Sequence, residues 1–283
     1  ELERALTVQH SAVSQLARTL RRLQSAKTLE SLYQVCVTEI RALTGYDRVT
    51  LYRFEQEGHG KVIGEALSDG MQPYLGLCFP ASDIPPQARE LYRLNWIRAI
   101  PDAEYQPVPI LPALRPDTGQ PLDLSFAVLR SVSPVHCHYL KNMGVRSSMS
   151  ISLLKDDQLW GLITCGHREP LRVPHELRTA CTSVGQLLSM QITLLQEKQE
   201  RGQQREKAAM IEELVAAMTA DQCDVMESLL PYAQSLLNLT AAGGLAILVE
   251  ERLHVFGVCP TRAEIHELYR WVRGQGKGVV HSH

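Results

Sequence analysis

Residues 148–165, SMSISLLKDDQLWGLITC, decide the fold of this chain. Met149, Ile151 and Leu153 alternate with serines, and this period of two is typical of a β-strand with one apolar face and one hydroxyl-bearing face. Residues 155–158 have the composition of a hairpin turn, and residues 159–165 return as the partner strand. The stretch therefore predicts an antiparallel sheet that is apolar on one side only.

Helices and further strands are predicted before this hairpin. The chain opens inside a helix, and a second helix begins after Thr28, a suitable N-cap, and ends at Gly45. Strand periodicity follows over residues 49–54 and 61–66. The apolar stripes are Val13, Leu16, Leu20 and Leu23 in the first helix and Leu29, Leu32, Cys36, Ile40 and Leu43 in the second.

A long insertion rich in proline separates these strands from the hairpin. Residues 67–147 hold 11 of the 15 prolines, too many for long helices or central strands. Short helices such as residues 87–97 are expected within it. Because long ordered loops in a compact domain are usually functional, the insertion is the first place to look for a site.

A second, incomplete unit is predicted after the hairpin. A long helix starts near Pro174, with an apolar stripe of Leu177, Cys181, Val184, Leu188 and Leu195, and runs into the charged residues 196–207. From about residue 210 we expect helices at 211–218, 228–237 and 262–273, and a strand at 245–250. Residues 279–283 have the pattern of a strand that is starting, and since a strand cannot stand alone, we expect a domain that is cut short.

Composition excludes several classes of protein. With 29 basic and 31 acidic residues the formal charge is −2, which argues against a general nucleic-acid binder. No apolar run is long enough to span a membrane, and no signal peptide is visible. The seven cysteines form no Cys-x-x-Cys pair, as in reduced thiols of the cytoplasm.

No familiar enzyme or metal motif is present. Phosphate-binding loops, dinucleotide fingerprints and zinc-protease motifs are all missing. Residues 136–138, His-Cys-His, invite a metal interpretation, but consecutive side chains diverge and rarely bind one ion. We expect no metal site.

Rigid backbone lies beside polar groups at residues 80–86, Pro-Ala-Ser-Asp-Ile-Pro-Pro. Pro85 and Pro86 remove two amide donors, which can leave the carbonyl of Asp83 free for a ligand. The alternative is a plain turn that starts a helix, with Ser82 or Asp83 as its cap.

Two arginines flank the same region. Arg98 and Arg130 are suited to hold carboxylates, and the serine face of the hairpin could add hydroxyl donors. Such a pocket would fit an elongated apolar ligand with carboxylates. The alternative is two surface arginines and a sheet face that is open to water.

Four stretches together resemble the chromophore-binding GAF domain of phytochromes. They are Asp47 to Phe54, Phe79-Pro80-Ala81-Ser82-Asp83-Ile84-Pro85, Leu129-Arg130-Ser131-Val132-Ser133-Pro134-Val135-His136 and Tyr139-Leu140-Lys141-Asn142-Met143-Gly144-Val145. The return strand 159–163 fits as well. Residues 205–283 resemble the first part of the PHY domain through residues 243–245 and 255–257. Within this family the chain is most similar to the bacterial, biliverdin-binding branch.

The resemblance implies roles for matching positions. The main-chain carbonyl of Asp83 would accept bonds from the pyrrole nitrogens of the chromophore, and its carboxylate would pair with an arginine of the PHY tongue. His136 would pack on the chromophore and bond it directly or through water. The other implied contacts are Arg98 and Arg130 to the B-ring propionate, Ser148 and Ser150 to the C-ring propionate, Tyr52, Phe79, Tyr92 and Tyr139 around the D-ring, and Ile84, Pro85 and Ser133 elsewhere in the site.

Two positions depart from the family pattern. Val135 stands where cyanobacterial and plant phytochromes carry the cysteine that attaches the bilin, and bacterial ones use a cysteine in an upstream PAS domain. Cys137 is a nonstandard candidate, if His136 and His138 lower its pKa. Gly166 stands where the family usually has a histidine that bonds the D-ring carbonyl, and His167 cannot replace it because adjacent strand residues face opposite sides.

The resemblance implies an α+β protein in three parts. These are a lead-in helix from an upstream PAS domain (1–23), a GAF domain with an antiparallel sheet and a proline-rich chromophore-binding insertion (24–197), and a connecting helix with a partial, GAF-like PHY domain (198–283). The implied cofactor is biliverdin IXα.

The implied function is red and far-red light reception in the cytoplasm. The apolar seam of the first helix and the long helix after Pro174 are more hydrophobic than one sheet needs to cover, which predicts a parallel homodimer through these helices. The light signal would reach a histidine kinase and response regulator outside this chain, which itself catalyses nothing. The alternatives are a GAF-type module for another ligand or for dimerisation alone, and an enzyme that uses His136 and Cys137. For such an enzyme, the sequence shows no third residue that would orient the pair.

Overall fold

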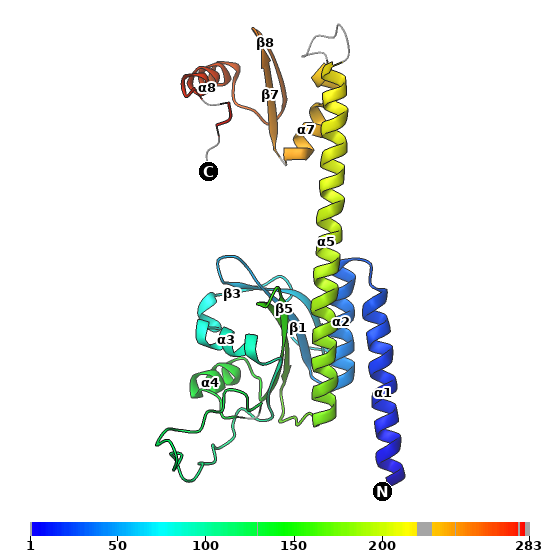
Figure 1. Cartoon of the computed structure of the whole chain (residues 1–283), viewed down its shortest axis with the longest axis vertical. Coiled ribbons are helices and arrows are strands. Elements are labelled where there is room, and N and C mark those ends of the chain that lie inside the picture. The colour runs from blue at the N-terminus through cyan, green and yellow to red at the C-terminus, as the bar shows by residue number, and fades with distance from the viewer. Residues whose placement is uncertain (1, 129, 220–227, 241, 277, 281–283) are drawn as a thin grey trace. The chain divides into compact units, whose positions relative to one another are not determined.

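The chain forms two compact units, Glu1–Glu197 and Lys198–His283. The computed structural model describes residues 2–128, 130–219, 228–240, 242–276 and 278–280 (Figure 1). The first unit is an antiparallel sheet between two layers of helices, which confirms the predicted α+β class. None of the helices in the described residues has the length and hydropathy needed to cross a membrane.

The two predicted N-terminal helices are present as α1 (Leu2–Ser25) and α2 (Leu29–Thr44). Thr28 caps α2, since its hydroxyl accepts a bond from the amide of Ser31 at 3.2 Å. Gly45 ends it with a left-handed φ of 74°, a conformation that favours glycine. Both boundaries follow from local chemistry alone.

The sheet of the first unit has six strands in the order β3-β2-β1-β6-β5-β4, and all neighbours are antiparallel. The predicted hairpin is its β5–β6 pair, and the predicted strands near 49–54 and 61–66 are β1 and β2. The bounds are β1 (Arg48–Phe54), β2 (Gly60–Leu67), β3 (Cys78–Phe79), β4 (Ile97–Ile100), β5 (Ser147–Lys155) and β6 (Gln158–His167).

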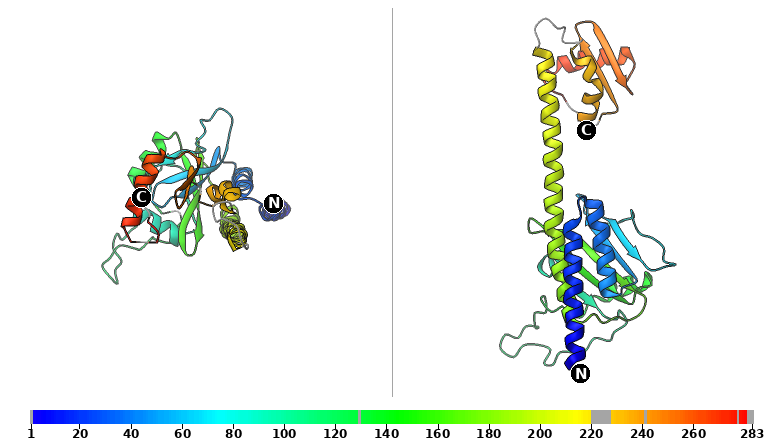
Figure 2. Two further views of the ribbon diagram at one scale, coloured as in Figure 1. Left: turned by 90° about the horizontal axis from the view of Figure 1, so that it is seen from above. Right: turned by 90° about the vertical axis from the view of Figure 1, so that its right-hand side faces the viewer.

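The core lies between one face of this sheet and three helices. Helices α1 and α2 and the first part of α5 (His175–Thr219) cover that face (Figure 2). Alternate strand residues enter the core, so Ser148, Ser150 and Ser152 of β5 point to the opposite face, as predicted. The completely buried members of the core are Leu23, Leu32, Cys36, Val37, Ile40, Val49, Leu51, Ile151, Leu153, Ile163, Cys181, Val184 and Leu188.

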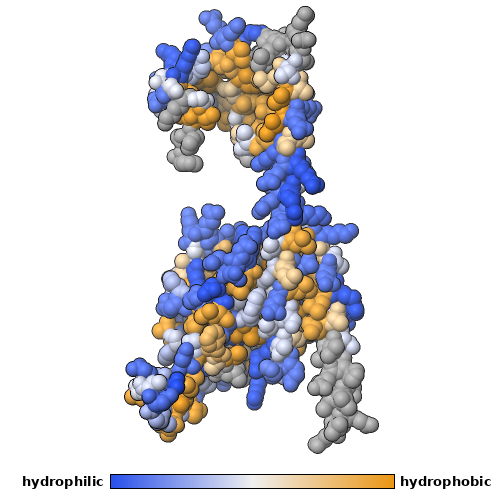
Figure 3. Space-filling view, viewed as in Figure 1, coloured by the Kyte–Doolittle hydropathy of each residue, from blue (hydrophilic) through white to orange (hydrophobic). Residues whose placement is uncertain are grey.

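The proline-rich insertion covers the other face with short elements. These are the 3-10 turn η1 (Ala81–Asp83), α3 (Pro86–Leu94) and α4 (Pro134–Asn142). The predicted helix 87–97 was too long, because Asn95 leaves helical geometry and Ile97 begins strand β4, which pairs with β5. Residues 104–128 form a loop with several exposed apolar side chains, visible at the lower left of Figure 3.

The second unit contains a two-stranded sheet, β7 (Gly244–Val249) with β8 (Arg252–Gly257), together with η2 (Leu230–Tyr232), α7 (Ala233–Thr240) and α8 (Arg262–Gly274). The helix expected at 211–218 is the end of the continuous α5. The helix expected at 228–237 is divided between η2 and α7. Residues 279–280 are not in a strand, and 281–283 lie outside the described residues.

Candidate functional site

A cavity lies on the face of the first sheet that carries the serines. It contains about 1100 Å³ of empty space, counting the part that is open to solvent. Two rows of paired residues cross its floor: Arg48, Gly166 and Ser148 in one row, and Thr50, Thr164 and Ser150 in the other. The hydroxyl oxygens of Thr50 and Thr164 are 2.7 Å apart. The floor is therefore polar and formed by rigid strands.

Aromatic side chains surround this floor. The lining includes five of them: Tyr52, Tyr74, Phe79, Tyr92 and Tyr139. The ring of Tyr52 packs edge-on against Phe54 at 5.3 Å and tilted against Phe79 at 6.2 Å. Gly60 leaves room for it, because a Cβ there would lie 1.8 Å from the Tyr52 Cζ. The cavity thus combines a polar floor with apolar walls, as ligand pockets commonly do.

The predicted motif at residues 80–86 brings the side-chain carboxylate and the main-chain carbonyl of Asp83 to the cavity. The hydroxyl of Tyr139 donates to the Asp83 carboxylate at 3.3 Å. Burial, together with this negative charge, raises the pKa of Tyr139 to about 12. No donor in the described part of the chain reaches the main-chain carbonyl of Asp83, since Pro85 and Pro86 have no amide hydrogen.

Positive charge gathers near His136, where the register of the sheet places Arg98 opposite Ser150. Burial lowers the pKa of His136 and of Arg130, and the charge of Arg98 lowers both further. Arg130 donates to the carbonyls of Ser125 and Ala127 at 3.0 and 3.2 Å. Within the described residues neither arginine is paired with a carboxylate, so the two can accept an anion.

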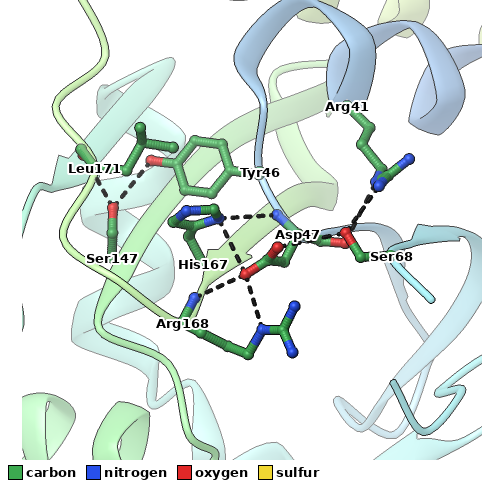
Figure 4. A network of polar contacts seen from close by, with 8 residues as sticks. All are labelled: Arg41, Tyr46, Asp47, Ser68, Ser147, His167, Arg168 and Leu171. Atoms are coloured by element: carbon green, nitrogen blue, oxygen red, sulfur yellow. Dashed lines mark hydrogen bonds and ion pairs between the residues drawn. The ribbon is translucent and has the colours of Figure 1, made fainter. Parts of the chain in front are cut away.

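A network at the rim fixes the end of β6 (Figure 4). Asp47 accepts bonds from the Arg168 amide at 3.0 Å and from its guanidinium at 3.2 Å. Burial would raise the pKa of Asp47, but these bonds and the charge of Arg168 lower it. Nδ1 of His167 accepts the Asp47 amide at 3.2 Å, and we favour this bond over the 3.1 Å ion pair with the same carboxylate, which needs a protonated ring.

The histidine beside Gly166, His167, belongs to the cavity lining, with its Nδ1 engaged by the Asp47 amide. His167 also packs edge-on against Tyr46 at 6.2 Å. Gly166 itself lies on the floor, where an added Cβ would come 3.3 Å from Val145.

The structure brings together most, but not all, of the predicted site residues. The following line the cavity: Tyr52, Phe79, Asp83, Ile84, Tyr92, His136, Tyr139, Ser148, Ser150 and Gly166. Pro85, Arg98, Arg130, Ser133 and Cys137 lie outside its lining. The expectation of a lowered pKa at Cys137 was wrong, because burial raises it and Arg98 opposes this only partly. The described residues contain no cluster that could hold a metal ion.

Several lining residues were missed, among them Arg48, Thr50 and Tyr74. The first two could have been found, because they alternate with Val49 in β1 and so share a face with Tyr52. Tyr74 lies in a loop, where its guanidinium partner Arg48 stacks 3.4 Å from the ring centre. No sequence pattern predicted that contact.

Family models match both units. A model described as GAF domain matches residues 28–192, and one described as Phytochrome region matches residues 208–283. The bacteriophytochrome of Pseudomonas aeruginosa is 44% identical over 180 residues, 64% of this chain and 25% of that protein. The Cyanobacterial phytochrome B of Nostoc sp. is 42% identical over 251 residues, 89% of this chain and 33% of that protein.

Solved structures agree with the family models. The bacteriophytochrome RpBphP3 of R. palustris has a TM-score of 0.79 and 36% identity, and covers 93% of this chain and 53% of that one. The photosensory core module of the Stigmatella aurantiaca phytochrome has a TM-score of 0.74 and 44% identity over 95% of this chain and 53% of that one. The chain spans about a third or less of the first curated relatives. It belongs to the phytochrome family of photoreceptors, with a GAF domain followed by a match to the phytochrome region.

Proposed function

We propose that the cavity of the first unit binds biliverdin IXα and that this chain is the light-sensing part of a bacterial phytochrome. The observation that supports this most strongly is the donor set around the cavity. Ser148, Ser150, Asp83 and five aromatic rings line the cavity, the Asp83 carbonyl has no donor among the described residues, and Arg98 beside Ser150 has no carboxylate partner there. An elongated, conjugated ligand with two carboxylates and several pyrrole N–H groups matches each of these.

Each residue has a task in this proposal. Arg98 and Arg130 hold one propionate, while Ser148 and Ser150 donate to the other, with Ser133 at the same end. The carbonyl of Asp83 accepts from the pyrrole nitrogens, and Ile84 and Pro85 follow it between the turn η1 and helix α3. His136 packs on the ring system, and Tyr52, Phe79, Tyr92 and Tyr139 enclose the ring that moves. The bilin supplies light absorption and isomerisation about a methine bridge.

The direct test is assembly of the purified chain with biliverdin. We expect a red-absorbing band and a changed spectrum after red light, with phycocyanobilin in parallel to identify the preferred bilin. Absence of any band would favour the alternative of a GAF-type module for another ligand or for dimerisation. A band without light-induced change would favour a bilin carrier that is not a photoreceptor.

The arginine contacts have their own test. Biliverdin dimethyl ester carries no carboxylates, so it should bind at least tenfold more weakly than biliverdin, a difference of about 1.4 kcal/mol. In Arg98→Ala combined with Arg130→Ala, the difference in affinity between the two ligands should become much smaller, because only the serine contacts to the other propionate still distinguish them. Equal affinity in the parent chain would show that these arginines do not hold the propionates.

We further propose that Cys137 does not attach the bilin. Burial raises the pKa of its thiol, which disfavours the thiolate, and the thiolate is the reactive form. The pigment should therefore leave this chain when the holoprotein is denatured and separated on a zinc-stained gel. Pigment that stays on the band, and is lost in Cys137→Ala, would contradict this.

A parallel homodimer is proposed through α5, where Met190 and Leu194 expose 70% and 54% of their surface. The contribution expected from the first helix is smaller than predicted, because Leu23 is buried in the chain's own core and Leu16 and Leu20 pack against it. The side chain of Val13 lies outside the described residues. Sedimentation should show a dimer at micromolar concentration, and only monomer in Met190→Glu with Leu194→Glu.

The remaining proposals concern the whole protein. We propose the divisions 1–23, 24–197 and 198–283 as lead-in helix, chromophore-binding domain and connecting helix with partial PHY domain. The output would be a histidine kinase and its response regulator, with no catalysis in this chain. The buried free thiols Cys36, Cys165 and Cys181 agree with a cytoplasmic location.

A further inference from the structure

One guanidinium, that of Arg89 in α3, binds three main-chain carbonyls. Its Nε donates to the carbonyl of Ile84 at 2.7 Å, and its Nη2 donates to those of Ala81 at 3.3 Å and of Gly58. The planar guanidinium has five N–H groups in a fixed fork, so a single arginine can serve carbonyls from separate segments. Lysine has no such geometry.

In the part of the chain that the structure describes, Arg89 forms no ion pair with a carboxylate. Among the described residues its partners are these carbonyls and the ring of Phe54, whose centre lies 4.5 Å from the guanidinium carbon. By contrast Arg93, one helical turn later, forms an exposed pair with Glu90 at 2.6 Å. Two arginines of one short helix thus have different tasks, and Arg93 provides a matched control.

The three carbonyls belong to two separate segments of the chain. Those of Ala81 and Ile84 stand on either side of Asp83, so Arg89 holds the backbone before and after that residue. The carbonyl of Gly58 belongs to the turn that joins β1 to β2. A Cβ added to Gly58 would lie 3.5 Å from Arg89 and from Ala81, which shows how closely the turn approaches. Arg89 therefore ties the Asp83 segment to the rigid sheet.

The segment needs such support because it has few bonds of its own. The turn η1 has no side-chain cap, and its one local bond runs from the Asp83 amide to the carbonyl of Pro80 at 3.1 Å. The prolines that follow contribute no donors. Tyr139 holds only the side chain of Asp83. The direction of its unpaired carbonyl is thus left to contacts from outside the segment.

We infer that Arg89 is a positioning residue, which aims the main-chain carbonyl of Asp83 into the cavity without touching the ligand. This inference rests on the proposed function for its consequence, because the aimed carbonyl matters only if a cationic, N–H-bearing ligand is bound. The inference has a structural half, that Arg89 restrains residues 81–84, and this half does not depend on any ligand. The two halves can therefore be tested separately.

The first experiment measures amide hydrogen exchange in the ligand-free chain. In Arg89→Lys and Arg89→Gln, amides 81–84 should exchange at least about threefold faster than in the parent, while strands β1 and β5 are unchanged. Arg93→Lys and Arg93→Gln should match the parent throughout. Unchanged exchange at 81–84 in both Arg89 variants would overturn the inference, whatever the parent binds. If Arg89→Gln fails to fold, Arg89→Lys decides.

The second experiment titrates the biliverdin complex by absorption. A well-aimed carbonyl stabilises the protonated form of the bound pigment, so its deprotonation midpoint should fall by about 0.5–1 pH unit in the Arg89 variants. The Arg93 variants should titrate like the parent. An unchanged midpoint with faster exchange would overturn the positioning role towards the ligand. A parent chain that takes up no bilin would instead refute the proposed function alone.

Discussion

The buried ion pair between Arg48 and Glu65 offers the sharpest test of how the cavity wall is held. Their facing atoms, Nη1 and Oε1, are 3.3 Å apart, and the two side chains are 10% and 2% exposed. The second Glu65 oxygen accepts the amides of Tyr74 at 2.8 Å and Leu75 at 3.0 Å. Arg48 stacks on the Tyr74 ring and donates to the carbonyl of Gln72. One carboxylate therefore anchors the loop that carries Tyr74.

The expected cost of losing Glu65 can be worked from these contacts. Glu65→Ala leaves the Arg48 charge buried without its partner, a change that costs about 3–5 kcal/mol of unfolding free energy. Glu65→Leu with Arg48→Met strands no charge and loses chiefly the bonds to the two loop amides, about 1–3 kcal/mol. The double variant should thus be more stable than Glu65→Ala. Either cost is a large part of the roughly 5–15 kcal/mol typical of a whole domain.

Urea unfolding measures this if the signal comes from the first unit alone. Trp96 and Trp160 belong to that unit, whereas Trp271 belongs to the second, so the series is made in a Trp271→Phe background. With a urea slope of about 2–3 kcal/mol/M, Glu65→Ala should lower the midpoint by about 1–2 M. The control is Glu55→Ala, whose partly exposed pair with Arg53 should contribute at most about 1 kcal/mol.

Two results would refute this reasoning about the pair. If Glu65→Ala shifts the midpoint no more than Glu55→Ala does, the buried pair does not hold the loop. If the double variant is less stable than Glu65→Ala, the cost does not come from a stranded charge on Arg48.

Three further predictions concern the cavity. Gly60→Ala should displace the Tyr52 ring and shift or broaden the red band of the biliverdin complex, whereas Gly64→Ala on the core side of the same strand should leave the band in place. Gly166→His should bind pigment nearly as the parent does but change the photoproduct yield or its dark decay, and unchanged photochemistry would mean that Gly166 is not beside the moving ring. Because burial lowers the pKa of His136, folding favours its neutral form, so the free energy of unfolding should decline as pH falls below about 6.5. In His136→Gln, urea midpoints measured over the same pH range should decline less.

Local chemistry made part of the fold predictable. The cap at Thr28 and the left-handed Gly45 fix α2 at both ends. In the β5–β6 hairpin, Asp156 and Asp157 both have positive φ, 51° and 58°, as a two-residue turn of type I′ requires. In these places a few consecutive residues determine the conformation, so the sequence could be interpreted without knowledge of distant contacts.

The formation of strand β4 and the position of Tyr74 in the cavity wall depend on contacts that the local sequence does not predict. Ile97–Ile100 has only four residues and becomes a strand because it pairs with β5. That pairing places Arg98 opposite Ser150. An arginine by itself suggested an anion site, but only the strand register shows that Ser150 lies next to it. Tyr74 lines the cavity because the buried carboxylate of Glu65 in strand β2 accepts a bond from its amide, a contact that the loop sequence itself does not reveal. Such long-range terms override local preference.

The groups that make the cavity suitable for a ligand are also those that the chain leaves unsatisfied. Arg98 and Arg130 carry like charges near each other, and the carbonyl of Asp83 has no donor among the described residues. Proteins tolerate such local costs mainly at functional sites. A ligand that brings carboxylates and N–H groups binds only the folded state, and at 1,000 times its Kd it would add about 4 kcal/mol of stability. The unsatisfied groups of the ligand-free cavity and its proposed affinity for a bilin therefore have the same physical origin.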